Sequence, residues 1–292
     1  MNQQGIQFGE HLTPSRRRWR IFLTIGPGFF WVILFLIIPL MAIAAISFFA
    51  RGPYGEIQPS LTLGNYKRLA GFGDFGFDPL YPSVMWRSVL LGGGTAIFCL
   101  GTGLPLAFFI SGLKVRWKNV ALTLVVIPFW TNLLIRTYAW QILLAPESPL
   151  SRVAPYPGAL AVFVGMVCDY LPFMVLPLYA SVEKLDWSLA EAAADLGANG
   201  LNVFRHAILP QIKPGLIAGM VLVFLPATGQ FVIPDLLGGA KTMLLGNAIQ
   251  QQFGSSRDWP FGAAIAMVSL ALMLAGLWFL NRRRAEPPPG II

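Results

Sequence analysis

The stretch GLIAGMVLVFLPATGQFVIP, residues 215–234, contains no charged side chain. About 20 apolar residues in a helix, at a rise of 1.5 Å per residue, cross the roughly 30 Å hydrocarbon core of a bilayer. This stretch is therefore long enough and apolar enough to be a membrane span. Three other uncharged stretches are at least as long, and they cover residues 21–50, 88–113 and 259–281.

Two further apolar stretches are each interrupted by one charge. Arg136 lies in the stretch 120–145, and Asp169 lies in the stretch 158–182. Across all 292 residues, 55% are hydrophobic and only 12% are charged, whereas a soluble domain carries roughly 25% charged residues. The sequence therefore predicts an all-α integral membrane protein with six transmembrane helices.

The basic residues predict the orientation of these spans. We expect the spans at residues 21–49, 86–112, 119–145, 158–182, 214–236 and 260–280. Cytoplasmic loops carry an excess of Lys and Arg, and with the N-terminus inside most of them are cytoplasmic: Arg16, Arg17, Arg18, Arg20, Lys114, Arg116, Lys118, Lys184, Arg205, Lys213, Arg282, Arg283 and Arg284. Fewer lie outside: Arg51, Lys67, Arg68, Arg152, Lys241 and Arg257. Both termini are expected in the cytoplasm, as a basic tail 1–20 and a tail 283–292 around a transmembrane domain 21–282.

Several other classes of protein are disfavoured. The net charge of +8 is explained by topology, so no nucleic acid is expected as a partner. The segment GGAKT (238–242) lacks the spacing of a phosphate-binding loop, and His11 and His206 lack the spacing of metal ligands. We therefore expect neither an enzyme nor a metal site. The first apolar run is longer than the 7–15-residue core of a signal peptide, which favours a retained span.

Two long polar segments connect the spans. The outer segment 50–85 is rich in Gly and Pro, which argues against regular structure. The cytoplasmic segment 183–213 is rich in helix formers, with a predicted capping box at Ser188 and Glu191 and a helix over 189–196 that ends at Gly197. These residues allow two interpretations. Glu191 and Gly197 either only cap and end the helix, or the helix also presents a docking face to a partner. A helix this short is marginal in water, so we expect a partner to pack on it.

The order of motifs in this segment resembles a known family. Glu191-Ala192-Ala193, then Gly197, then Ile208-Leu209-Pro210 is similar to the cytoplasmic loop of ABC importer permeases. In that family the loop is a coupling helix between the fourth and fifth spans that sits in a cleft of the ATPase subunit. The resemblance implies that Glu191 and the alanines contact the ATPase, that Gly197 makes the turn, and that Leu209 and Pro210 complete the motif.

Further stretches resemble the spermidine/putrescine permeases within this family. They are IPFWTNLLIRTYAW (127–140), LPFMVLPLYASVEKLD (171–186), FVIPDLLGG (231–239) and RDWPFGAA (257–264). Gln230 stands where some polyamine permeases carry an acidic residue. Permeases for iron, thiamine or phosphonates have similar loops, and these cargoes stay open as alternatives.

The resemblance also implies a location and a set of partners. The chain would be a multi-pass protein of the cell inner membrane that binds no cofactor, because ATP would be bound by a separate cytoplasmic ATPase dimer. A second permease, expected to be a different chain, and a periplasmic binding protein would complete the importer. The competing class is an ion-coupled secondary transporter, but the chain shows no paired half-repeat of the kind such proteins carry, and such a carrier has no use for an ATPase-docking loop.

The two charges within the spans are the main candidates for the cargo path. Asp169 lies about 11 residues, or roughly 16 Å, into its span, close to the bilayer midplane. A charge at that depth is costly, so it should face a partner or a cavity. One interpretation is a structural ion pair between Asp169 and Arg136. The other interpretation places Asp169 on the route of a polycation. Aromatic faces for its ammonium groups would come from Tyr170, Trp130 and Tyr138, and Asp235 would be a second acid at the mouth of the route.

Overall fold

The computed structural model describes residues 26–73, 76–152, 154–239 and 242–282. The tails 1–20 and 283–292 and the predicted start of the first span at residue 21 lie outside these residues. In the described part, five helices are long and apolar enough to cross a membrane: Gly26–Ile46, Leu80–Ser111, Ala159–Val182, Gly200–Gly229 and Trp259–Trp278. A sixth crossing requires that one bent helix pair count as a single span, so the number six stays a prediction.

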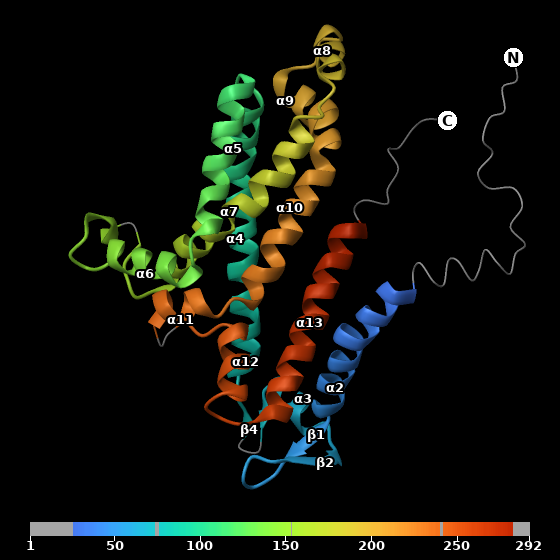
Figure 1. Cartoon of the computed structure of the whole chain (residues 1–292), viewed down its shortest axis with the longest axis vertical. Coiled ribbons are helices and arrows are strands. Elements are labelled where there is room, and N and C mark those ends of the chain that lie inside the picture. Colours follow the sequence, from blue (N-terminus) through green and yellow to red (C-terminus); the bar gives the residue numbers. More distant parts are fainter. Residues whose placement is uncertain (1–25, 74–75, 153, 240–241, 283–292) are drawn as a thin grey trace, which may run out of the picture.

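The helices and strands follow one another along the chain as shown in Figure 1. The helix Gly26–Ile46 contains the π-helical turn η1 (Ile33–Ile37) and α2 (Ile38–Ile46). The remaining elements are β1 (Phe49–Arg51), β2 (Ile57–Leu61), α3 (Gly64–Leu69), β3 (Phe72–Gly73), β4 (Gly76–Phe77), α4 (Leu80–Ser111), α5 (Val115–Trp130), α6 (Leu133–Leu143), η2 (Pro149–Arg152), α7 (Ala159–Val182), α8 (Trp187–Asp195), α9 (Gly200–Val203), η3 (Phe204–Ile208), α10 (Leu209–Gly229), α11 (Val232–Gly238), α12 (Leu245–Phe253) and α13 (Trp259–Arg282).

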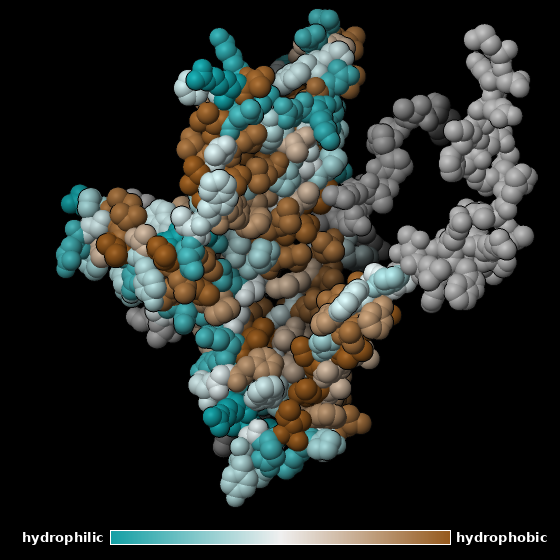
Figure 2. All heavy atoms as spheres, in the orientation of Figure 1, coloured by the Kyte–Doolittle hydropathy of each residue, from teal (hydrophilic) through white to brown (hydrophobic). Residues whose placement is uncertain are grey.

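The core is a three-helix bundle of α4, α7 and α10. Glycine allows the closest approach within it. A Cβ on Gly215 of α10 would lie 2.4 Å from the carbonyl oxygen of Pro177 in α7, which is closer than real contacts allow. By contrast, the helix Gly26–Ile46 buries none of its apolar window. Figure 2 shows hydrophobic side chains over α2, α5 and α13, with hydrophilic ones at the two ends of the molecule and on the side where α6 projects. The apolar surface is expected for a protein surrounded by lipid.

The expected third span is not one straight helix. α5 ends at Trp130, and α6 begins at Leu133 after a bend of 95°. Thr131 and Asn132 adopt extended backbone conformations, and the Asn132 side chain accepts a hydrogen bond from the N–H of Leu134 (2.8 Å). Asn is a strong helix N-cap, so this residue begins a new helix where the hydropathy pattern predicted continuity.

Both ends of the expected fifth span also differ from the sequence prediction. The span begins earlier and ends earlier, because the helix runs over Gly200–Gly229 and the short helix α11 follows separately. The connection before α13 contains the helix α12, which the sequence did not predict.

The expectation that segment 50–85 lacks regular structure is wrong. It contains the hairpin β1–β2, the helix α3 and the small hairpin β3–β4. Arg68 of α3 donates to Asp258 (2.9 Å) and lies 4.0 Å from the ring centre of Phe261. Asp258 is buried and the Arg68 side chain is half-exposed, and this ion pair attaches the segment to the start of α13.

Candidate functional site

The predicted coupling helix is present as α8, with different capping from that expected. Asp186, not Ser188, is the N-cap, and its carboxylate accepts from the N–H of Ser188 (3.0 Å). At the other end Gly197 has φ +84°. Its N–H donates to Ala194 (2.9 Å) and the next N–H, of Ala198, to Ala193 (3.1 Å). This is the Schellman arrangement, in which a left-handed glycine ends the helix.

One glutamine attaches α8 to the following helix. The side chain of Gln211 in α10 accepts from the N–H of Asp186 (2.9 Å) and donates to the carbonyl oxygen of Ala207 (2.8 Å). Ala190 faces inward and is 8% exposed. The start of α8 is therefore attached to the helix Gly200–Gly229 by the hydrogen bond between Asp186 and Gln211.

The rest of α8 is open at one end of the molecule (Figure 1). Glu191 and Ala192 are exposed. Three apolar side chains of this segment are exposed as well: Trp187 at 52%, Leu189 at 52% and Leu196 at 90%. Of the other expected coupling residues, Leu209 packs against the core, whereas Pro210 is exposed at the start of α10. The predicted contact residues thus divide into an open tip and an anchored base.

A second fixed contact lies beside the base of this loop. Lys118 of α5 forms an ion pair with Glu183 (3.0 Å), and its ammonium lies 5.9 Å from the ring centre of Tyr179. Hydrogen bonds from Tyr179 and Lys118 hold the pKa of Glu183 below its ordinary value. The contact joins the first turn of α5 to the end of α7.

The bend between α5 and α6 creates the environment of Arg136. A helix that ends leaves its last carbonyl groups without helical partners. Here the guanidinium of Arg136 donates both to the carbonyl oxygen of Pro128, in the last turn of α5, and to the carboxylate of Asp169 in α7. Asp169 is 8% exposed. Of the two interpretations of Asp169, the ion pair is the one present in this structure.

A second helix break, between α10 and α11, contacts α7 at Tyr170, the residue after Asp169. α10 ends at Gly229, and the side-chain oxygen of Gln230 accepts from the N–H groups of Phe231 (3.0 Å) and Val232 (3.2 Å) at the start of α11. The amide nitrogen of Gln230 donates to the hydroxyl of Tyr170 (3.1 Å). The two breaks are therefore held side by side by neighbouring residues of α7, and α6 packs against α11. We call Arg136, Asp169, Tyr170 and Gln230 the break cluster.

The other expected path residues lie around this cluster without joining it. Trp130 ends α5 and is 79% exposed, Tyr138 on α6 is 50% exposed, and Asp235 on α11 is exposed. The sequence interpretation did not foresee the Pro128 carbonyl or the role of Gln230 as a link between helices. An Asn preceded by Pro and Thr inside an apolar run was the available signal for the first break.

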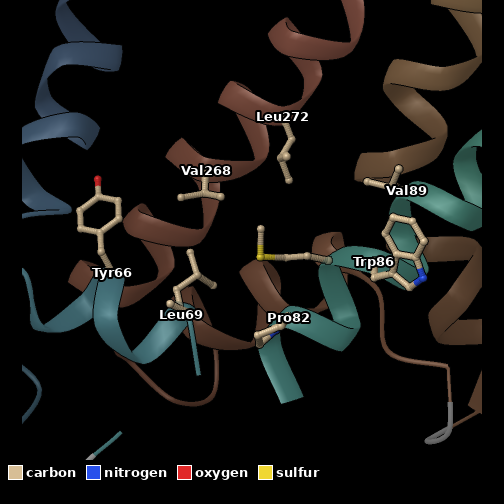
Figure 3. Close-up of a pocket in the computed structure, with 9 residues that line it drawn as sticks. Tyr66, Leu69, Pro82, Trp86, Val89, Val268 and Leu272 are labelled. Carbon is tan, nitrogen blue, oxygen red and sulfur yellow. The ribbon is translucent and has the colours of Figure 1, made fainter. Parts of the chain in front are cut away.

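An apolar cavity of about 580 Å³ lies apart from both sites. Figure 3 shows Val268 and Leu272 of α13 pointing toward Leu69 of α3 and toward the first turns of α4, where Trp86 closes one side. Its lining is almost wholly apolar, which suits contact with hydrocarbon rather than with a polar cargo.

Comparison with known proteins identifies the architecture. Residues 26–282 match the family described as the binding-protein-dependent transport system inner membrane component. The chain belongs to this family. It is the membrane permease of a binding-protein-dependent ABC importer, as the resemblance of the loop implied. The family is one of transport permeases, not a class of enzymes.

Two curated relatives align with the permease over nearly their whole length. The spermidine/putrescine transport system permease protein PotB of Haemophilus influenzae is 42% identical, with 89% of this chain and 92% of the relative covered. The protein of the same name from Escherichia coli K12 is 41% identical, with 86% and 94% covered.

A solved structure shares the fold at much lower identity. A bacterial ABC transporter involved in the import of the acidic polysaccharide alginate has a chain with a TM-score of 0.72 and 16% identity, and the alignment covers 93% of this chain and 98% of that one. The helical architecture is therefore that of an ABC importer membrane subunit.

Proposed function

We propose that this permease carries linear polyamines, spermidine or putrescine, across the inner membrane. The observation that carries this proposal is the identity of 42% and 41% to spermidine/putrescine permeases, extended over about nine-tenths of both chains. One permease for another cargo, the maltose/maltodextrin permease MalG of Vibrio parahaemolyticus, is less similar, at 30% identity.

In the proposed importer, α8 docks on one subunit of a cytoplasmic ATPase dimer. Its open apolar tip supplies the contact, with Glu191 beside it, and Gln211 passes the motion to α10. A second permease, a different chain, completes the membrane pathway, and a periplasmic binding protein delivers the cargo. Both termini lie in the cytoplasm. ATP is bound by the ATPase alone.

The proposed pathway runs past the break cluster. Irregular backbone inside a membrane is tolerated where it is buried or lines a cavity, and broken helices are a feature of transport sites. Asp169 and Tyr170 hold the two breaks in place. Trp130 and Tyr138, which are exposed beside them, offer aromatic faces to ammonium groups.

Transport by the reconstituted importer tests this function. The permease, its ATPase, the second permease and the binding protein are placed in liposomes, and uptake of radiolabelled spermidine, putrescine, thiamine, ferric iron and a phosphonate is compared. We expect uptake of the polyamines only, and only with ATP. Preferential uptake of another cargo would refute the polyamine assignment, and uptake driven by an ion gradient without ATP would favour a secondary transporter.

A further inference from the structure

A polar cavity of about 530 Å³ lies between α11 and α12, in the half of the molecule away from α8 (Figure 1). Its volume falls within the roughly 300–1,000 Å³ typical of small-molecule sites. Six polar side chains line it: Asp235, Thr242, Asn247, Gln250, Gln251 and Ser255. The lining contains no Lys or Arg within the part of the chain that the structure describes. We call it the amide cavity.

Asn247 holds the walls of this cavity together. Its side chain accepts from the N–H of Leu244 at the start of α12 (3.3 Å) and donates to the carbonyl oxygen of Phe231 at the start of α11 (2.9 Å). Leu245 and Ala248 bury the opposite side of α12. As a result α12 is fixed with the exposed amides of Gln250 and Gln251 along the cavity.

Asp235 is the one carboxylate of the cavity. It forms no side-chain hydrogen bond or ion pair with any other residue of the described ranges. The acids of the neighbouring helices differ, because Asp169 is paired with Arg136 and Asp258 with Arg68. An incoming cation at those two sites would have to displace an arginine, whereas at Asp235 no described side chain competes.

The geometry points to the amide cavity as the receiving site for the terminal ammonium group of a linear polyamine before it reaches the break cluster. This inference rests on the proposed function. Asp235 lies five residues beyond Gln230 on the same short segment, so a cargo bound here is already next to the second helix break.

The chemistry of the lining matches an alternating chain of amines and methylenes. A carboxylate forms a charge-assisted hydrogen bond with an ammonium group, and neutral amide oxygens accept its remaining N–H donors. Pro234 and Met243 give the cavity an apolar wall for the methylenes. An anionic cargo such as a phosphonate would be repelled by Asp235, so the site selects for positive charge.

Substitution of Asp235 tests the site. The complete importer in liposomes, with saturating binding protein, is assayed for its maximal rate of putrescine and spermidine uptake. Because the site loses a charge-assisted contact, we expect Asp235→Asn to lower the rate about ten- to hundredfold and Asp235→Glu to retain most of it. Glu147→Gln, an exposed acid outside the cavity, should leave the rate unchanged. Equal rates for Asp235→Asn and wild type would overturn the inference.

Occupancy of the cavity is measured separately. In a background lacking the two native cysteines, Ser255→Cys is labelled with a water-soluble thiol reagent. Spermidine should slow the labelling in the wild-type Asp235 background and not in Asp235→Asn. Labelling that spermidine does not affect in either background would contradict binding here. If the wild-type importer itself carries no polyamine, the proposed function fails, and that result is distinct from a failure of this site alone.

A double variant distinguishes cargo binding from a structural role. Lys241 is the basic residue nearest to Asp235 in the sequence and lies outside the described residues. If Asp235 only neutralised Lys241, Lys241→Gln would restore transport to Asp235→Asn. We expect no restoration, and a restored rate would overturn the inference.

Discussion

At the scale of single residues, the most consequential contact is the one between Arg136 and Asp169. It joins the last turn of α5, the first turns of α6 and the middle of α7 through a single guanidinium group. The side chain of Arg136 is 18% exposed and that of Asp169 is 9% exposed. Loss of either one would therefore leave the charge of the other largely buried and unpaired. Removing one partner of a buried pair costs about 3–5 kcal/mol, whereas replacing both costs far less.

This difference gives a testable prediction. Asp169→Asn and Arg136→Gln alone should each reduce the amount of assembled importer recovered from membranes, and the double variant should recover part of it. Glu147→Gln serves as the control for loss of an exposed charge. Single variants that assemble fully but transport poorly would assign Asp169 to the cargo instead, and fully normal assembly and uptake would exclude both roles.

At the scale of the elements, α8 depends on one backbone conformation at its end. Gly197 has φ +84°, whereas the nearby Gly200 begins α9 with open space around it and no positive φ. A left-handed conformation costs most residues roughly 1–2 kcal/mol, and a β-branched residue is least suited to it.

We therefore expect Gly197→Val to disturb the turn after α8 while the permease still enters the membrane. Less ATPase subunit should co-purify with the variant, and ATP-dependent uptake should fall. Gly200→Val is the matched control and should behave like wild type. Equal losses in both variants would mean that the segment tolerates no bulk at all, and no loss at Gly197 would show that the turn is dispensable for coupling.

The elements also show where sequence reasoning succeeds and fails. Runs of uncharged residues predicted the long helices, because crossing a bilayer requires apolar side chains and satisfied backbone groups regardless of detail. The bend at Thr131 and Asn132 was missed because hydropathy does not register a cap inside an apolar run. The spacing of Ser188 and Glu191 fits a capping box and predicts Ser188 as the N-cap, yet Asp186 lies two residues earlier and is an equally strong cap.

The candidate site could be predicted in composition but not in contacts. Asp169 and Arg136 stand out in sequence because a charge within a span must have a partner or a cavity, and the structure pairs them. The link from Gln230 to Tyr170 joins residues 60 positions apart. Such a link depends on how α7 crosses α10, which one sequence does not specify.

At the scale of the whole molecule, the predicted topology places α8 and the outer hairpins on opposite sides of the membrane. Figure 1 shows them at opposite ends of the molecule. A reporter that is active only in the cytoplasm should therefore be active when fused after Lys118, Lys213 or Arg284. It should be silent after Gly71, Arg152 or Gly254. Reversal at any one of these sites would contradict the six-span orientation and would identify the segment that does not cross.

If this permease receives the energy of ATP through α8, then α8 must contact the ATPase subunit, and cross-linking measures that contact. Ala192 is a small, exposed residue on α8, and Ser60 is a small, exposed residue on β2 at the far end of the molecule. In the assembled, transporting importer, Ala192→Cys should cross-link to a cysteine in the docking cleft of the ATPase subunit, with a yield that changes when ATP is added. Ser60→Cys should form no such adduct. An importer that transports normally while Ala192→Cys forms no adduct, or forms no more than Ser60→Cys, would contradict the account.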